Sequence, residues 1–454
     1  MKFLKKKISI IGLGYVGLPT FLVLSNVKKN KKYLYRVEGI EKNDSRGRQI
    51  QRNFYDKKIW IKTNDKIFSK YLNEAFLRKK DVYINTDLEK IKESSIVVVS
   101  VNFDFVNPSN SSFQNVKNLS KELAMKIKKK TLVIFETTLP PGTCDKIVLP
   151  VFRDILRKRK MNIQDIYFCY SFERVMPGKN YINSIVSNFR CYSGINKQSK
   201  TVCKKFLKTF IDYKKYKLTE FEKIIDCETA KILENSYRAA NIALIDEWTK
   251  VSKTMNVDLN SIIKSIKLRK THSNMMWPGL GVGGYCLTKD PYFIKFATKN
   301  FFKKKINFPM ISNTLKINKS MVKTSINYLI SKIKTFNKKR FLICGATYKE
   351  DTSDIRFSPS IELIKKLKSK GGKITIYDPH LESDKLTLDK VNFTKNFKPN
   401  FDIIIFCVAH EKFKQLSFKN LKKTLIFDLN RVLTDYQKNY LRKTGFKDSQ
   451  IVTI

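Results

Sequence analysis

Ile8-Ser9-Ile10-Ile11-Gly12-Leu13-Gly14-Tyr15-Val16-Gly17 is the stretch that decides the fold of the first part of the chain. An apolar run passes directly into three closely spaced glycines, which predicts a strand, a tight turn and the start of a helix. This arrangement holds the pyrophosphate of a dinucleotide against a helix N-terminus, although a turn without a ligand is the alternative. The residues expected to contact the dinucleotide are Gly12, Gly14, Tyr15, Val16 and Gly17.

An acidic residue follows at the distance expected for such a site. Glu41 ends the next β-branched run, 36–41, about two dozen residues after Gly17. Its carboxylate is expected to bind the ribose hydroxyls of the adenosine and to repel a 2′-phosphate, which favours NAD over NADP. Lys42, Arg46 and Arg48 follow it and could attract that phosphate instead.

Short β-branched runs, each bounded by turn or helix signals, recur in two parts of the chain. They are residues 8–11, 36–41, 96–101 and 132–135, and then 340–344, 373–377, 403–408 and 425–429. Such alternation is typical of parallel sheets with crossover helices. Between the two parts, residues 219–255 carry apolar side chains at helical spacing, which predicts one long helix.

The predicted fold class is α/β, with two doubly wound Rossmann-like domains joined by a long central helix and a helical middle domain. The expected boundaries are a cofactor-binding domain over 1–210, a central domain over 211–325 and a C-terminal nucleotide-binding domain over 326–454. A chain of 454 residues is too long for one hydrophobic core, which agrees with this division.

The formal charge of +50 raises nucleic acid or a membrane surface as partners. The lysines are spread along the whole chain, so we interpret the charge as a bias in residue usage that also attracts an anionic substrate. No apolar stretch reaches transmembrane length, and the apolar run near the N-terminus carries the glycine fingerprint rather than a signal-peptide cleavage site. A cytoplasmic protein with no nucleic-acid partner and no membrane insertion is expected.

Eight cysteines and three histidines are the residues from which a metal or disulfide site would be built. The cysteines form no Cys-x-x-Cys pair, and His272, His380 and His410 are well separated along the chain. Neither a metal site nor a disulfide framework is therefore expected.

One cysteine has unusual neighbours. Cys286 lies in Gly281-Val282-Gly283-Gly284-Tyr285-Cys286-Leu287-Thr288-Lys289-Asp290. Glycines let the backbone approach a ligand closely, while Lys289 and Asp290 can tune the ionisation of the thiol. The stretch predicts a nucleophile. A small buried side chain is the alternative, and it is our interpretation of the other seven cysteines.

Four further polar residues are candidates for the same site. Glu173 and Thr138 each follow an apolar, strand-like run, and the carboxyl ends of parallel strands face the ligand crevice. Lys231 and Asn235 stand four residues apart on the predicted long helix and so share one face. Each residue alone is equally well explained by a solvated surface, so the hypothesis depends on their occurring together.

Taken together, these segments resemble the UDP-glucose/GDP-mannose dehydrogenase family, the nucleotide-sugar 6-dehydrogenases, along nearly the whole chain. The matching motifs occur in the family's order at 12–19, 136–143, 173–178, 231–235, 278–290 and 345–356. The resemblance implies a four-electron oxidation of a sugar C6 alcohol to a carboxylate with two NAD⁺, in the synthesis of surface polysaccharide precursors. It also implies a homo-oligomer, expected to be a dimer formed through the long helix.

The resemblance also implies catalytic roles. Cys286 would trap the aldehyde as a thiohemiacetal, which the second oxidation turns into a thioester. Lys231 and Asn235 would stabilise the developing oxyanion. Asp290, with a water held by Thr138, would assist proton transfer.

Further roles concern hydrolysis and binding. By resemblance, Glu173 would serve in hydrolysis of the thioester, Arg356 and Thr138 would contact the cofactor, and Arg269 or Lys270 would enter the site of a neighbouring subunit. The residues expected to contact the nucleotide sugar are Glu173, Lys231, Asn235, Gly281, Gly283, Gly284, Tyr348, Lys349 and Arg269.

The substrate stays open at this point. The pattern Glu-Arg-x-x-Pro-Gly at 173–178 resembles the branch that oxidises UDP-N-acetylhexosamines, whereas Tyr285 resembles the UDP-glucose branch. A GDP-mannose 6-dehydrogenase and a non-catalytic nucleotide-binding relative are the alternatives.

Overall fold

The computed structural model describes residues 5–58, 60–61, 63–103, 110–333, 335–381, 391–419, 421 and 424–453. The chain forms two compact units, each described by itself below. The first comprises Met1–Leu233 and Phe293–Ile306, and the second comprises Glu234–Tyr292 and Asn307–Ile454. Helices α8 (Ile224–Met255) and α10 (Asp290–Asn300) contribute residues to both units.

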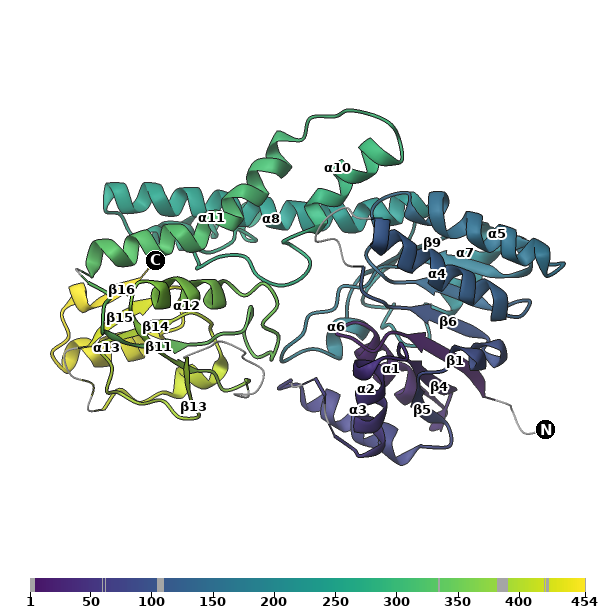
Figure 1. Cartoon of the computed structure of the whole chain (residues 1–454), viewed down its shortest axis with the longest axis horizontal. Coiled ribbons are helices and arrows are strands. Elements are labelled where there is room, and N and C mark those ends of the chain that lie inside the picture. Colours follow the sequence, from purple (N-terminus) through teal and green to yellow (C-terminus); the bar gives the residue numbers. More distant parts are fainter. Residues whose placement is uncertain are drawn as a thin grey trace. The chain divides into compact units, whose positions relative to one another are not determined.

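The first unit is built on an eight-stranded sheet in the order β10-β9-β8-β7-β6-β1-β4-β5. Strands β6, β1, β4 and β5 of this sheet are labelled in Figure 1. Neighbouring strands are parallel except for β8 and β9. The strands are β1 (Lys6–Ile11), β4 (Tyr35–Ile40), β5 (Val82–Asn85), β6 (Ile96–Val99), β7 (Leu132–Phe135), β8 (Tyr167–Tyr170), β9 (Arg190–Gly194) and β10 (Leu218–Glu220). A separate hairpin joins β2 (Lys28–Lys29) and β3 (Lys32–Tyr33).

Helices connect these strands, and the first of them begins at the glycine fingerprint. The helices are α1 (Gly17–Asn26), α2 (Ser45–Tyr55), α3 (Lys66–Leu77), α4 (Asn110–Lys126), α5 (Leu149–Lys158), α6 (Asn183–Val186) and α7 (Lys197–Leu207). Phe21 and Leu24 of α1 are buried in one cluster with Ile8 and Ile10 of β1 and Val37 of β4. This burial of apolar surface fixes the start of α1 at the carboxyl edge of the sheet.

The second unit holds a six-stranded, all-parallel sheet in the order β13-β12-β11-β14-β15-β16. Its strands are β11 (Arg340–Cys344), β12 (Lys373–Tyr377), β13 (Asn392–Thr394), β14 (Ile403–Phe406), β15 (Leu425–Asp428) and β16 (Ile451–Thr453). Its helices, besides parts of α8 and α10, include α9 (Leu259–Ile266), α11 (Pro309–Lys332), α12 (Pro359–Ser369) and α13 (Asp435–Lys443).

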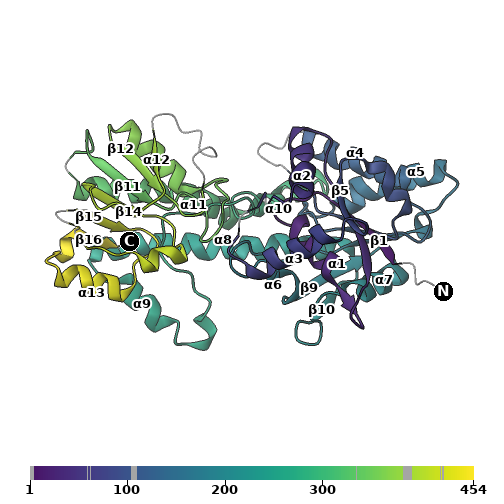
Figure 2. The ribbon, with the colours of Figure 1, turned by 90° about the horizontal axis from the view of Figure 1, so that it is seen from below.

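Helices cover both faces of this second sheet (Figure 2). Successive residues of a strand face opposite sides, so β11 contributes to two apolar clusters. Phe341 and Ile343 pack in one cluster with Leu363 of α12, whereas Leu342 packs in the other with Leu441 of α13. With both faces covered, the carboxyl edge of the sheet is the place where polar ligands can bind.

The predicted α/β class with two doubly wound, Rossmann-like sheets is confirmed. The runs 132–135, 340–344 and 373–377 coincide with β7, β11 and β12. The long helix begins at Ile224 instead of 219, because residues 218–220 pair with β9 as strand β10. The predicted bounds of the three domains stay a prediction. Within the described ranges, no helix is long and apolar enough to span a bilayer.

Candidate active site

Two glycines of the fingerprint turn are required by close packing, whereas the third has open space around its backbone. Gly12 has φ +88°, and a Cβ there would lie 2.9 Å from the carbonyl oxygen of Ser100. A Cβ on Gly17 would lie 1.8 Å from the carbonyl oxygen of Gly12, so only glycine lets the helix pack so close to the turn. A Cβ on Gly14 would meet no protein atom within 4 Å. The backbone there has room for a pyrophosphate, so this turn fits a dinucleotide cofactor.

Tyr15 and Val16 form the step from the turn into α1. Val16 is the residue that precedes the helix, and its carbonyl oxygen accepts a hydrogen bond from the Thr20 amide at 3.3 Å. The carbonyl oxygen of Tyr15 accepts a hydrogen bond from the hydroxyl of Tyr181. These contacts fix the backbone on which the predicted cofactor contacts depend.

Glu41 lies directly after β4, the neighbour of β1 in the sheet. Its side chain is buried, and Oε1 accepts a hydrogen bond from the amide of Leu13 inside the fingerprint turn. The carboxylate is therefore held beside the dinucleotide turn, as expected for a ribose ligand. Arg46 Nη1 lies 3.9 Å from the other carboxylate oxygen, and its side chain is 61% exposed.

We expect this arrangement to favour NAD over NADP by at least about tenfold in kcat/KM, because a 2′-phosphate would face a fixed carboxylate. Steady-state rates with both cofactors measure the ratio. Glu41→Ala should narrow it, whereas Arg46→Ala should leave NAD the better cofactor. Equal efficiency in the unaltered protein would mean that Arg46 receives the phosphate and that Glu41 does not discriminate.

Glu173 and Lys231 form a buried pair in the first unit. Lys231 Nζ donates a hydrogen bond to the backbone oxygen of Glu173 at 2.8 Å and lies 3.8 Å from its Oε1. The other carboxylate oxygen of Glu173 accepts a hydrogen bond from the amide of Val175. Both side chains are buried, at 6% and 7% exposure. The structure thus brings together two residues that the sequence suggested independently.

The loop after β7, which carries Thr138, is fixed by a buried ion pair that the sequence analysis missed. Arg190 pairs with Glu136, and both side chains are 3% exposed. Ser100 donates a hydrogen bond to Glu136 Oε2 at 3.0 Å. Burial raises the pKa of Glu136, and the charge of Arg190 opposes that rise. Glu136 opens a quoted motif, but Arg190 lies 54 residues further on, at the start of β9, where no motif marks it.

A second missed residue, Glu228, holds the far end of the same loop. Its carboxyl group is fully buried and accepts hydrogen bonds from the amides of Gly142 at 2.6 Å and Cys144 at 2.9 Å. Burial raises its pKa to about 8, although these hydrogen bonds oppose the rise. The sequence offered one signal that could have identified Glu228: it is an acidic residue three positions before Lys231 on the predicted long helix. Thr138 itself is partly exposed between these two anchored ends.

In the second unit, Cys286 differs in exposure from all other cysteines. The eight cysteines all lie in the described ranges; Cys286 is exposed and the other seven are buried. The carbonyl oxygen of Cys286 accepts hydrogen bonds from the amides of Lys289 at 3.1 Å and Asp290 at 2.9 Å. The thiol therefore lies on a closed turn that leads directly into α10.

A polar cluster follows that turn. Asp290 is fully buried, and Oδ2 accepts a hydrogen bond from Asn235 Nδ2 at 2.7 Å. Its Oδ1 accepts a hydrogen bond from Lys289 Nζ at 2.8 Å, and the same Nζ lies 4.4 Å from the centre of the Tyr285 ring. Asn235 of α8 and Asp290 are thus in direct contact, although different roles were predicted for them.

The glycines of the Cys286 loop pack against a second loop of the same unit. A Cβ on Gly283 would lie 2.8 Å from Cβ of Tyr348, and one on Gly284 would lie 2.6 Å from the Tyr348 ring. Gly284 has φ +80°, and its amide donates to the carbonyl oxygen of Arg356 at 3.1 Å. Gly281, with φ +155°, packs on Pro359. Close packing inside the protein explains these glycines, and their contact with a sugar stays a prediction.

The remaining basic candidates lie at or near the surface of the second unit. Arg356 forms hydrogen bonds with the Asp354 carboxylate at 2.7–3.0 Å. Lys349 is partly exposed, and Nζ lies 3.8 Å from Glu350 Oε1. Arg269 and Lys270 are exposed. Their predicted contacts with cofactor, substrate or a neighbouring subunit stay predictions.

A glycine turn that fits a dinucleotide, with the buried carboxylate of Glu41 beside it and a second doubly wound sheet later in the chain, is the arrangement expected of an NAD-dependent dehydrogenase of nucleotide sugars. Three domain models of one family match the chain in order: the NAD binding domain at residues 6–211, the central domain at 226–320 and the UDP binding domain at 342–436. The chain belongs to the UDP-glucose/GDP-mannose dehydrogenase family, and its cofactor is NAD.

Individual relatives are similar to this chain over nearly their full length. The chain is 31% identical to a UDP-N-acetyl-D-mannosamine dehydrogenase of Methanococcus vannielii, with 97% of this chain and 96% of the relative covered. It is 26% identical to a UDP-N-acetyl-D-glucosamine 6-dehydrogenase of Salmonella typhi, with 95% and 98% covered. The structure of a UDP-D-ManNAc dehydrogenase from Pyrococcus horikoshii superposes with a TM-score of 0.79 at 23% identity, covering 99% of both chains, which shows the shared fold.

Proposed function

We propose that this enzyme oxidises C6 of a UDP-N-acetylhexosamine or of UDP-glucose to the carboxylate, through a thioester on Cys286. The observation that carries the proposal is the exposure of this one cysteine on the turn that leads into the cluster of Asn235, Lys289 and the buried Asp290. Buried cysteines are inert, whereas an exposed thiol next to a lysine can ionise and attack a carbonyl carbon.

Bound NAD⁺ supplies the hydride acceptor for each of the two oxidations. The first oxidation turns the C6 alcohol into an aldehyde, with loss of a proton from the hydroxyl. The Cys286 sulfur then adds to the aldehyde carbon and forms a hemithioacetal. Loss of a second hydride and of the hydroxyl proton leaves a thioester, which water cleaves to the carboxylate and the thiol. A covalent aldehyde cannot leave between the two oxidations.

The polar residues supply charge and proton transfer for these steps. The Lys231 cation is buried, so it would interact strongly with an oxyanion that forms near it. Asn235 is oriented by Asp290, and its amide group is the second donor in the proposal. Glu173, held by Lys231 and the Val175 amide, would accept a proton from the water that cleaves the thioester.

The named relatives favour the N-acetylhexosamine substrates. Those reported above carry the names of UDP-N-acetyl-D-mannosamine and UDP-N-acetyl-D-glucosamine dehydrogenases. The sequence pattern at 173–178 points to the same branch. We therefore propose a UDP-N-acetylhexosamine as the preferred substrate over UDP-glucose, with GDP-mannose as the alternative. We also infer a role in the synthesis of surface polysaccharide precursors.

We expect two NADH for each uronic acid formed, because the sugar stays bound to Cys286 between the oxidations. NADH absorbance and product, counted in the same reaction over a panel of UDP- and GDP-sugars, give both the stoichiometry and the preferred substrate. Release of an aldehyde with one NADH would contradict the thioester route. Reduction of NAD⁺ by none of these sugars would contradict the proposed substrate class.

We also propose that two copies associate through α8. Tyr237, Leu244 and Val251 recur every seven residues along this helix and are 61%, 44% and 49% exposed. Apolar side chains repeated at this spacing form one stripe on a helix, and a second copy would remove it from water. Arg269 or Lys270, which are both exposed, is expected to reach the substrate of the neighbouring subunit.

A further inference from the structure

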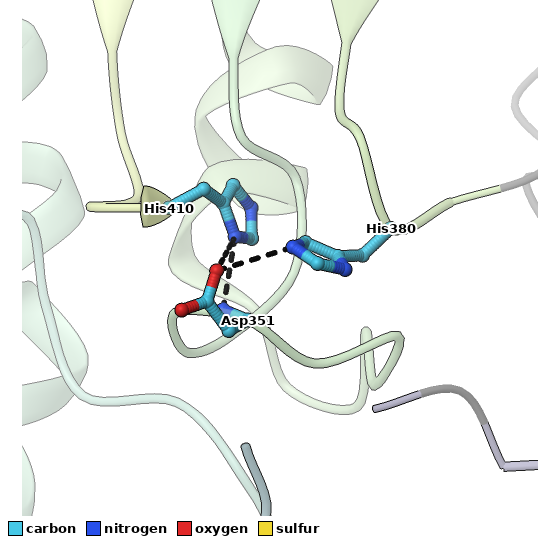
Figure 3. A group of neighbouring side chains, drawn as sticks. All are labelled: Asp351, His380 and His410. Atoms are coloured by element: carbon cyan, nitrogen blue, oxygen red, sulfur yellow. Dashed lines mark hydrogen bonds and ion pairs between the residues drawn. The ribbon is translucent and has the colours of Figure 1, made fainter. Parts of the chain in front are cut away.

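Three loops at the carboxyl edge of the second sheet bring together Asp351, His380 and His410. The loops follow β11, β12 and β14, which are neighbours in the sheet. One possible ligand atom from each residue lies within 4.8 Å of the other two. Figure 3 shows both imidazole rings turned toward the Asp351 carboxylate. Two of the chain's three histidines therefore lie close together, although they are thirty positions apart in the sequence.

The spacing of these atoms is close to that of ligands around one metal ion. His380 Nε2 lies 3.2 Å from Asp351 Oδ1, and His410 Nδ1 lies 3.8 Å from the same oxygen. Ligands of a tetrahedral zinc ion, each bound at about 2.0–2.1 Å, are about 3.3 Å apart. Side-chain rotations that shorten separations of at most 4.8 Å to about 3.3 Å would place the three atoms around a common centre.

His410 also has the support that a metal-binding histidine needs. It is fully buried, and its Nδ1 accepts a hydrogen bond from the Asp351 amide at 3.0 Å, so in the neutral ring the proton sits on Nε2. Nε2 lies 3.2 Å from Asp378 Oδ2. Metal-bound histidines typically donate their second N–H to a carboxylate in this way. A metal would take over the Nδ1 lone pair from the Asp351 amide.

Asp378 is itself held in place by the backbone. It accepts hydrogen bonds from the amides of Ala346 at 2.7 Å, Thr347 at 3.3 Å and His380 at 2.8 Å. It thereby joins the loop after β11 to the loop after β12. The carboxylate that orients His410 is thus fixed independently of any ligand.

Burial and the neighbouring groups shift the pKa values of the three residues in different directions. Burial raises the pKa of Asp351, but the contact with His410 and the Glu411 amide outweigh it and lower this pKa to about 2. Burial and the neighbouring His410 lower the pKa of His380, which keeps that ring neutral. Burial opposes protonation of His410, but Asp351 and Asp378 raise its pKa, so a metal competes there with a proton.

We propose that Asp351, His380 and His410 bind one divalent transition-metal ion, for which Zn²⁺ is the reference. Two imidazoles and a single carboxylate suit zinc and its first-row neighbours, whereas Mg²⁺ and Ca²⁺ prefer oxygen ligands. Three protein ligands leave a coordination position for water. This proposal replaces the expectation of no metal site, which rested on the distance between the histidines along the sequence.

Such an ion would tie together the three loops that supply its ligands. The loop after β11 also carries Tyr348, which packs on Gly283 and Gly284, and Arg356. Metal binding would therefore stabilise the second unit and the backbone that supports the Cys286 loop. The proposal concerns binding and stability, and it stands independently of the dehydrogenase chemistry.

The test is a titration of the full-length protein, stripped with a chelator, in which Zn²⁺ is shared with a chromophoric competitor. One tightly bound equivalent is expected, together with a higher Tm, and Mg²⁺ should produce neither. His380→Ala and Asp351→Asn should each weaken Zn²⁺ binding by more than about 100-fold, and Asp378→Asn by about 10–100-fold. No tightly bound Zn²⁺ in the unaltered protein would overturn the proposal.

Two controls exclude other zinc ligands. His272→Ala removes the histidine outside the cluster, and Cys286→Ser removes the exposed thiol; both should still bind one Zn²⁺. Loss of binding in either variant, with retention in His380→Ala, would overturn the assignment. A measurement on the unaltered protein does not depend on whether the variants fold. Bound Co²⁺ should show visible absorption without a thiolate charge-transfer band. The presence of such a band would contradict the proposed ligands.

Discussion

Cys286→Ser should lower steady-state oxidation by at least about three orders of magnitude while leaving the binding of NAD and of the nucleotide sugar nearly unchanged. A serine hydroxyl near neutral pH is far less nucleophilic than a thiolate, so the aldehyde would no longer be trapped. The fingerprint turn and Glu41 lie in the other compact unit, and the glycines of the loop are untouched. Turnover and equilibrium binding, measured on the same preparation, separate the two effects.

Cys203→Ala is the matched control, because it removes a fully buried cysteine of α7. It should retain most of the activity, with at most a modest loss of stability from the small cavity. Near-normal turnover in Cys286→Ser would show that the thiol only packs in its loop. Loss of NAD binding in that variant would show instead that the substitution disturbs more than the nucleophile.

Glu173→Gln should produce a different failure, in which the enzyme stalls after its oxidations. The amide oxygen of glutamine can still accept the hydrogen bond from the Val175 amide, but it cannot take a proton from water. We expect a burst approaching about two NADH per active site, followed by a steady rate lower by at least about 100-fold. Intact-mass measurement of the quenched protein should show the sugar bound through a thioester.

The double variant Glu173→Gln with Cys286→Ser should lack this adduct, which assigns it to the thiol. Glu222→Gln, a substitution of an exposed carboxylate with a side chain 85% accessible, should show neither burst nor adduct. If Glu173→Gln turns over normally, or stalls without an adduct, Glu173 has no role in hydrolysis and its contact with Lys231 is purely structural.

The sequence predicted the parts of this fold that depend on local pattern. Central strands such as β7 and β11 are buried on both sides and therefore read as continuous apolar runs. The short strands β10 and β13 escaped prediction, because each has only three residues and pairs along one edge. Their pairing comes from the neighbouring strand and not from their own composition.

The sequence identified most of the candidate residues but did not predict which of them are in contact. Motifs identified Glu173 and Lys231, but only the fold shows that they touch, since 58 residues separate them. The same holds for Gly284 and Tyr348, whose contact explains a glycine that the sequence assigned to substrate binding. Arg190 and Glu228 were missed because a buried charge has no local signature. The groups that pair with such a buried charge come from distant parts of the sequence and are identified only in the folded structure.

Because seven cysteines are buried and one is exposed, the reactivity of the cysteines reports whether this protein is folded. A thiol-alkylating reagent added to the native enzyme meets one accessible sulfur, and in denaturant it meets eight. Mass spectrometry of the alkylated chain therefore counts folded and unfolded molecules directly. Because the first sulfur to react is also the proposed nucleophile, protection from alkylation by a bound sugar would report occupancy without any turnover.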